Sequence, residues 1–198
     1  MVGIKKEWIK IDNSIVVKTE NLTKSFLNKE IIKNCNMTVY EGSIYGLLGA
    51  NGIGKTTVFK LLTGLLKSTM GKIEILGMDM AVSKNDILRN IGCLIETPVF
   101  YEHLSANQNL KIHLGEPISG LDPMGIRDMR ELFLELAKTH NTTILISSHI
   151  LSEIEHIADT IGVINNGKII KEDTLSSLKT QFTDGLENYF LDLMNGGK

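Results

Sequence analysis

The sequence has few cysteines and no long apolar run. Cys35 and Cys93 are its two cysteines, and their spacing matches neither a metal site nor a disulfide-rich secreted domain. No stretch reaches the ~18 consecutive apolar residues that a membrane-spanning helix needs, and charged residues interrupt positions 1–14 before a signal segment can form. These absences predict a cytoplasmic chain with inert core thiols, whose place at a membrane would depend on a partner.

The sequence also lacks an excess of positive charge. Its 21 lysines and arginines stand against 23 acidic residues, for a formal net charge of -2. A chain with this balance has no net basic field to hold a polyanion, so we expect no nucleic-acid partner. Hydrophobic residues make up 42% of the 198 residues, which is enough to bury the core of one domain over residues 1–198.

Strand and helix patterns alternate along the first half of the chain. An opening antiparallel β portion is predicted from the apolar residues at 15–17 and 37–40. Residues 43–48 (SIYGLL) form a short apolar run that indicates a buried strand ending at a glycine-rich turn. The pattern then predicts helices at residues 55–66 and 86–90 and extended segments at residues 72–76 and 91–95.

The second half shows the same alternation more clearly. Asp122 is predicted to cap a helix with Pro123 at its first position. Residues 142–148 indicate a buried parallel strand, followed by a helix with Ile150, Ile154, Ile157 and Ala158 on one side. A hairpin around Asn165-Asn166-Gly167 joins strands at 161–164 and 168–170, and a polar helical tail follows. The predicted fold class is α/β with a mostly parallel sheet.

A glycine-rich segment, GANGIGKTT at residues 49–57, fits the phosphate-loop pattern G-x-x-x-x-G-K-[ST]. It lies between a predicted strand and a predicted helix, which is the context that the pattern requires. Its glycines let the backbone wrap a phosphate closely, so that N–H groups and the helix N-terminus face the anion. The nucleotide-binding candidates are Gly49, Asn51, Gly52, Gly54, Lys55, Thr56 and Thr57.

Three side chains of this segment have distinct predicted roles. Lys55 would bring its charge to the β and γ phosphates, the Thr56 hydroxyl would bind Mg²⁺, and Thr57 would reach the α phosphate. A glycine-rich turn that only caps a helix is the alternative, and the strand before it and the helix after it favour the phosphate loop.

Further segments resemble, in order, the ATP-binding subunits of ABC transporters, most closely those of the bacitracin-export and lantibiotic-protection type. The resemblance implies a P-loop NTPase core flanked by helices, an N-terminal antiparallel β portion, and ATP and Mg²⁺ as cofactors. It divides the chain into residues 15–103 (β portion, phosphate loop and glutamine-type loop), 104–115 (a remnant of the family's helical subdomain), 116–175 (second half of the core) and 176–198 (helical tail).

The resemblance also implies roles for four more residues. Phe26, in ENLTKSF, matches an aromatic platform for adenine, although on its own it would be read as a core residue. Glu96, in IGCLIETPVF, stands where the family usually has a glutamine near the metal and the γ phosphate. Glu116, in EPISGLDP, matches the glutamate that polarises the attacking water, and His149, in ILISSHIL, matches the switch histidine. The candidate catalytic set is therefore Glu96, Glu116 and His149, with Thr56 and Glu96 at the metal.

Part of the family pattern is missing. Only 20 positions separate Glu96 from Glu116, where the family has a helical subdomain, an LSGGQ-like signature and a strand ending in aspartate. No LSxGQ-like string occurs in the sequence, and Gly115 stands in place of the magnesium-supporting aspartate. The pattern indicates an internal deletion, either natural or engineered, or a numbering that runs on across omitted residues. Alternating residues 110–114 (LKIHL) are a candidate replacement strand, although Lys111 and His113 fit a strand buried on both faces poorly.

The motifs present and absent in the sequence leave three functional hypotheses. The first is a transporter ATPase that pairs with a second ATPase subunit and a membrane permease at the inner face of the cell membrane, with residues 98–101 transmitting closure. The second is a catalytically inactive nucleotide-binding module, because half of each composite site is gone; for these 198 residues it is favoured. The third is a GTPase or small-molecule kinase, which fits less well because no late N-K-x-D-like motif occurs and arginines are few.

Overall fold

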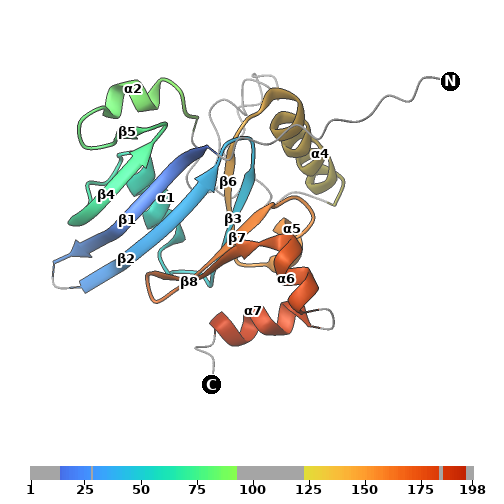
Figure 1. Ribbon diagram of the computed structural model, residues 1–198. Helices are drawn as coiled ribbons and strands as arrows, with labels where there is room; N and C mark the ends of the chain where they lie inside the picture. The colour runs from blue at the N-terminus through green and yellow to red at the C-terminus, as the bar shows by residue number, and fades with distance from the viewer. Residues whose placement is uncertain (1–13, 28, 93–122, 183–184, 195–198) are drawn as a thin grey trace.

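The described residues form two four-stranded sheets with helices packed against them (Figure 1). The computed structural model describes residues 14–27, 29–92, 123–182 and 185–194. One sheet is antiparallel, in the order β2-β1-β4-β5, with bounds β1 (Ile15–Phe26), β2 (Lys29–Tyr40), β4 (Met70–Ile75) and β5 (Met78–Asp79). The other has the order β6-β3-β7-β8, with bounds β3 (Ile44–Leu48), β6 (Ile144–Ser148), β7 (Thr160–Asn165) and β8 (Lys168–Thr174).

The described helices lie against these sheets. Figure 1 shows α4 beside β6 and α7 below β7 and β8, while α1 packs near the antiparallel sheet. Their bounds are α1 (Lys55–Leu62), α2 (Lys84–Leu88), α4 (Pro123–His140), α5 (Leu151–Ile154), α6 (Leu175–Gln181) and α7 (Leu186–Met194).

Strand β3 is shared by both hydrophobic cores of the molecule. It pairs in parallel with β6 on one side and β7 on the other, and all five of its residues are buried. Because side chains alternate across a strand, Tyr45 and Leu47 face the core that contains α1 and the antiparallel sheet. Ile44 and Leu48 face the core built with α4, α5, α6 and α7. The strand that leads into the phosphate loop is thus fixed from both faces.

The two sheets are joined along β2 and β8. The backbone N–H of Lys33 donates to the carbonyl of Gly167 at 2.8 Å. Further along, the Glu172 carboxylate of β8 accepts hydrogen bonds from the Thr38 N–H at 3.2 Å and from the Tyr45 hydroxyl at 2.7 Å. A carboxylate with two donors is a strong acceptor, so Glu172 ties β2 and β3 to β8.

Tyr45 reaches Glu172 only because position 162 has no side chain. A Cβ built on Gly162 of β7 would lie 2.0 Å from the Tyr45 hydroxyl oxygen, well inside van der Waals contact. Burial raises the pKa of Tyr45 well above its ordinary value, and the Glu172 charge adds to this. Burial likewise raises the pKa of Glu172.

Cys35 is buried in the same region, which agrees with the predicted inert thiol. Burial, and to a smaller extent the nearby Glu172 charge, raises the pKa of Cys35 to about 12. The reactive thiolate therefore does not form at neutral pH. Cys93 lies outside the described residues.

The predicted fold class is confirmed, while several predicted lengths are wrong. The antiparallel opening portion and the parallel β6-β3-β7 core are both present. Strands β1 and β2 run for 12 residues each, far beyond the predicted 15–17 and 37–40. Residues 18–25 look irregular in sequence because β1 contains register shifts between Thr19 and Ser25, which interrupt strict alternation.

Two helices are shorter than predicted. Helix α1 ends at Leu62 instead of residue 66, because the Thr63 hydroxyl donates to the Phe59 carbonyl and Gly64 follows with φ 64°. Helix α5 spans only Leu151–Ile154, and the buried Ile157 and Ala158 lie in the turn after it. Apolar spacing alone does not distinguish a helix from a turn that packs on the same surface.

The remaining predictions divide between confirmed elements and segments outside the described residues. The hairpin turn is confirmed, since Asn166 and Gly167 have φ 48° and 76° and β8 pairs antiparallel with β7. The tail forms α6 and α7. The Asp122 cap, most of the predicted strand at 91–95 and the segment 104–115 with its candidate strand lie outside the described residues, so the proposed division of the chain stays a prediction.

Candidate functional site

The phosphate-loop segment joins β3 to α1. Strand β3 ends at Leu48, and α1 begins at Lys55 with Gly54 as its N-cap at φ 118°. A Cβ on Gly54 would lie 2.7 Å from Ile32 Cδ1, and its φ is strained for any residue with a side chain. Gly52 also has a positive φ of 77°, with nothing within 4 Å of its missing Cβ. The loop therefore combines a backbone that needs glycine with open space beside it.

Lys55 is held at the centre of this loop. Its side chain is only 5% exposed, and its ammonium donates to the carbonyl oxygens of Gly49 at 2.7 Å and Ala50 at 3.1 Å. A buried ammonium requires such partners. Phosphate oxygens offer stronger, charged acceptors than carbonyls, so an anion in the loop is able to take over these hydrogen bonds.

A hollow of about 160 Å³ opens over the loop. It is lined by Ile31, Asn51, Gly52, Gly54, Lys55, Thr56 and Thr57. Six of the seven predicted phosphate-loop residues therefore share one small polar space, and Gly49 lies next to it through its hydrogen bond with Lys55. Backbone N–H groups at a helix N-terminus and a lysine ammonium together suit a phosphate group.

Ile31 is a lining residue that the sequence reasoning missed. It lies on β2 and reaches the hollow from the antiparallel sheet. The full extent of β2 would have indicated it, because this strand brings Ile31 against the core that contains α1 and the antiparallel sheet. Phe26, at the end of β1, does not line the hollow.

Phe26 is nevertheless accessible to a ligand. It pairs with Lys29 where β1 turns into β2, and it is 43% exposed. The Lys24 ammonium lies 5.0 Å from the ring centroid, in a cation–π contact. The ring is therefore not in the core position that its residue type alone would suggest, and its stacking role stays a prediction.

His149 follows β6 and lies next to the phosphate loop in the fold. The residue before it, Ser148, accepts a hydrogen bond from the backbone N–H of Gly49 at 3.2 Å. His149 itself is exposed and does not line the 160 Å³ hollow. The Ser148 hydroxyl also contacts the Glu153 carboxylate, a pair that the sequence reasoning missed. Glu96 and Glu116 lie outside the described residues.

The described residues contain no group of three His, Cys, Asp or Glu side chains arranged to hold a metal ion. Of the two predicted metal ligands, only Thr56 is described, and its exposed side chain lines the hollow. A single hydroxyl suits Mg²⁺ that is carried mainly by phosphate oxygens and water, which is how this ion usually binds with nucleotides. The described residues therefore fit Mg²⁺ that is bound together with a nucleotide.

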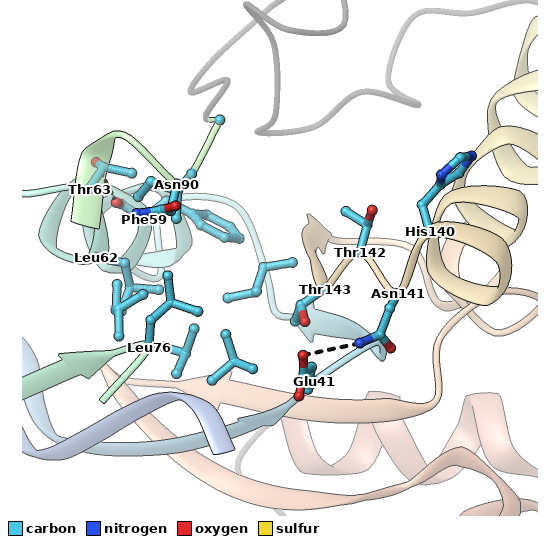
Figure 2. Close-up of a pocket in the computed structure, with 16 residues that line it drawn as sticks. Glu41, Phe59, Leu62, Thr63, Leu76, Asn90, His140, Asn141, Thr142 and Thr143 are labelled. Atoms are coloured by element: carbon cyan, nitrogen blue, oxygen red, sulfur yellow. Dashed lines mark hydrogen bonds between the residues drawn. The ribbon is translucent and has the colours of Figure 1, made fainter. Parts of the chain in front are cut away.

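A second, larger cavity lies away from the loop (Figure 2). Its volume is about 410 Å³, and its walls come from β1, α1, β4, the chain at Asn90–Gly92 and the start of β6. Apolar side chains including Phe59, Leu62 and Ile75 dominate it, and Figure 2 shows Glu41 and Asn141 at one end, joined by a 3.1 Å hydrogen bond. The described residues of this lining include no lysine or arginine to attract a phosphate.

Within the described residues, no helix combines the length and the apolar character needed to cross a lipid bilayer.

Comparison with known proteins places these features in a family. The family model described as "ABC transporter" matches residues 32–185. The chain is 36% identical to the bacitracin transport ATP-binding protein BcrA of Bacillus licheniformis, over 88% of this chain and 74% of that protein. It is 37% identical to the lantibiotic transport ATP-binding protein SrtF of Streptococcus pyogenes, over 79% of this chain and 90% of that protein.

Solved structures show the same fold. An ATP-binding subunit of an ABC transporter superposes with a TM-score of 0.73 at 22% identity, covering 89% of this chain and 99% of that one. A cassette solved in its ADP conformation gives a TM-score of 0.73 at 20% identity, covering 90% of this chain and 98% of that one.

The alignments also measure what this chain lacks. The alignment with BcrA runs over 228 positions, yet 88% of this 198-residue chain is about 174 residues, so about 54 positions have no residue here. The alignment with SrtF runs over 210 positions against about 156 residues of this chain, and again leaves about 54. Two relatives thus support the internal shortening that the interval from Glu96 to Glu116 indicates.

Proposed function

Because this chain belongs to the ABC transporter family, we propose that it is the ATP-binding subunit of a transporter that exports a peptide antibiotic or protects against it. The names of the bacitracin and lantibiotic relatives support the substrate class. The position of Lys55 supports nucleotide binding most directly, because its buried ammonium rests on two carbonyl oxygens at the mouth of a phosphate-sized hollow.

The residues of the loop would divide the work of holding Mg²⁺ and ATP. Gly52 and Gly54 let backbone N–H groups approach the phosphates, and Lys55 transfers its hydrogen bonds from the carbonyls to the β and γ phosphates. The Thr56 hydroxyl would bind Mg²⁺, which neutralises phosphate charge when bound. Phe26 would hold the adenine by stacking.

The partners we propose are a membrane permease and a second ATPase subunit. Residues 98–101, outside the described part, would contact the permease, and the subunit would lie on the cytoplasmic face of the membrane. The permease selects the cargo in this proposal, so the specificity for a given peptide does not reside in this chain.

We also propose that the chain as it stands binds ATP without turning it over. The 54 or so missing positions, the absence of an LSxGQ-like string and Gly115 in place of an acid support this second function. Hydrolysis requires groups that stabilise charge in the transition state, and a site with half of its composite wall absent cannot supply them. Intact ATPase action, with Glu116 orienting water, is the competing hypothesis.

Two measurements test these proposals on the same material. Titration calorimetry with Mg²⁺ and ATP should show saturable binding, and competition with GTP should show a preference for ATP. No heat of association from well-folded protein would refute the nucleotide site.

Phosphate release under saturating ATP then separates the two functions. We expect no turnover above buffer. Steady release that disappears in both Lys55→Ala and Glu116→Gln would reject the inactive module and support the intact ATPase.

A further inference from the structure

Ser148 connects the phosphate loop to the turn that carries His149. On one side, its backbone carbonyl accepts a hydrogen bond from the N–H of Gly49, the first residue of the loop, at 3.2 Å. On the other side, its hydroxyl accepts from the Ile150 N–H at 2.9 Å. Ser148 is 2% exposed, so the Ser148 side of both bonds is shielded from water. One buried residue therefore holds both the start of the loop and the residue after His149.

The Ser148 hydroxyl has one proton and two acceptors within reach. The Ile150 carbonyl lies 3.0 Å away, and the Glu153 carboxylate is in direct contact. An ionised carboxylate is the stronger acceptor, so the proton goes to Glu153. With the proton directed there, a lone pair of the hydroxyl faces the Ile150 N–H.

Glu153 thereby decides the orientation of the hydroxyl that fixes the His149 turn. It belongs to the first turn of α5, and Arg130 of α4 ties the same helix by donating to the Ser152 carbonyl at 2.8 Å. The half-buried Glu153 is thus carried by an anchored element, while the His149 side chain is exposed. The network runs from Lys55 through the Gly49 backbone and Ser148 to Glu153.

We propose that Glu153 is a positioning residue for the γ-phosphate side of the nucleotide site. Through the Ser148 hydroxyl it holds the backbone on both sides of His149 at a fixed distance from Gly49. The inference deepens the proposed function, because it assumes that His149 reaches the terminal phosphate of bound ATP. Glu153 itself does not touch the nucleotide.

The first test compares affinities for ATP and ADP. Calorimetry with Mg²⁺ should show that Glu153→Ala weakens ATP binding about tenfold, the equivalent of one charge-assisted hydrogen bond, while ADP binding changes less than about twofold. Glu153→Gln should keep most ATP affinity, because its amide oxygen still accepts the hydroxyl proton. Ser152→Ala, an exposed serine in the same helix, is the matched control and should bind like the parent chain.

A double-mutant cycle tests whether Glu153 acts through His149. Glu153→Ala should cause no further loss of ATP affinity in a chain that already carries His149→Ala. Equal weakening of ATP and ADP, or additive losses in the cycle, would overturn the inference, because both indicate a general structural defect. Should Glu153→Ala fail to fold, Ser148→Ala removes the same hydrogen bond and carries the same expectation.

Hydrogen exchange of the Ile150 amide gives a readout without nucleotide. Exchange should become faster in Glu153→Ala and stay unchanged in Glu153→Gln and Ser152→Ala. An unchanged Ile150 rate in Glu153→Ala would reject the positioning role even if ATP binds well. Absence of ATP binding by the parent chain would reject the proposed function, and with it the assumption about His149.

Discussion

The 410 Å³ cavity and the 160 Å³ hollow differ in size and in the chemistry of their walls. The larger, about 410 Å³, is lined mainly by apolar side chains from both the antiparallel sheet and the core sheet. The smaller, about 160 Å³, is lined mostly by a glycine-rich backbone, two threonines and a buried lysine. Charged ligands need oriented dipoles and a countercharge more than they need volume, so the smaller hollow is the one that suits the phosphates of a nucleotide.

The comparison also separates binding from stability. The buried apolar side chains around the larger cavity belong to the core that contains α1 and the antiparallel sheet, so changing them should alter folding. The smaller hollow is lined mostly by polar side chains and glycine backbone, so changes there should alter affinity. A variant at the larger cavity that changes ATP affinity, or a variant at the smaller hollow that changes only the free energy of unfolding, would contradict this division.

The largest effect is expected from the wall of the larger cavity. Ile75 is 3% exposed in β4, and Ile75→Ala should lower the free energy of unfolding by about 3 kcal/mol, because it removes buried apolar contacts and enlarges a space that is already there. Chemical denaturation measures this loss. ATP affinity should stay within about twofold of the parent chain.

Leu76 is the matched control, since it lines the same cavity but is 44% exposed. Leu76→Ala should cost less than about 1 kcal/mol. A large loss of ATP affinity in Ile75→Ala would contradict the separation of the two hollows.

Lys55→Ala should have the next largest effect. It removes the ammonium that would bind the phosphates, so ATP affinity should fall at least about 100-fold, or about 2.7 kcal/mol. Calorimetry measures the affinity, and the melting temperature should change little. Lys72→Ala, in which an exposed lysine of β4 is removed, should leave affinity unchanged. Retained affinity in Lys55→Ala would remove the basis for placing the nucleotide here.

Phe26→Ala tests whether the nucleotide site extends beyond the smaller hollow to the ring at the end of β1. Loss of one aromatic stacking partner should weaken ATP about tenfold, or about 1.4 kcal/mol. Inorganic triphosphate lacks a base, so its affinity should not change. Equal weakening of both ligands would mean that Phe26 supports the loop rather than the adenine.

The smallest effect concerns Glu172, which lines neither hollow. Burial raises its pKa, so the folded chain keeps a proton at pH values where the unfolded chain has lost it. The free energy of unfolding should therefore fall as the pH rises from the ordinary value of 4.5 through the raised folded value. Cys35 and Tyr45 stay protonated across this window, because burial raises the pKa of Cys35 to about 12 and the pKa of Tyr45 well above its ordinary value.

Glu172→Gln should remove this pH dependence while ATP affinity stays the same. Denaturation curves at several pH values test it, and the difference in unfolding free energy between the two chains is the relevant quantity. A parent chain that gains stability relative to Glu172→Gln as the pH rises would have the opposite sign and would contradict the raised pKa.

Local signals explain which parts of the fold were predictable. The phosphate loop is encoded by consecutive residues, and its flanking strand and helix lie where the sequence indicates. The Asn166-Gly167 turn is equally local, because both residues adopt positive φ values that few other residues tolerate.

Features that depend on distant partners were not predictable. The length of β1 is set by pairing with β2 and β4 rather than by its own apolar pattern. Helix α5 stops at Ile154, yet Ala158 is still buried, and both residues approach the space left by the missing side chain of Gly46. Spacing in the sequence reports burial correctly there but not the backbone that achieves it.

The candidate site divides in the same way. Lys55 and its glycines were predictable because the motif is contiguous, whereas Ile31 enters from another sheet. The Ser148–Glu153 contact spans five positions across a strand end, a turn and a short helix. No sequence period brings these two residues together, so only the folded chain reveals their contact.

The close approach of Tyr45 to Gly162 also restricts how this chain is able to evolve. With Cβ and hydroxyl oxygen only 2.0 Å apart, any side chain at position 162 displaces the phenol and removes a donor from Glu172. A larger residue at position 162 therefore requires a change at position 45. A lineage that acquires alanine at 162 must first shorten the residue at 45, and the carboxylate at 172 is then left with the Thr38 N–H as its described donor.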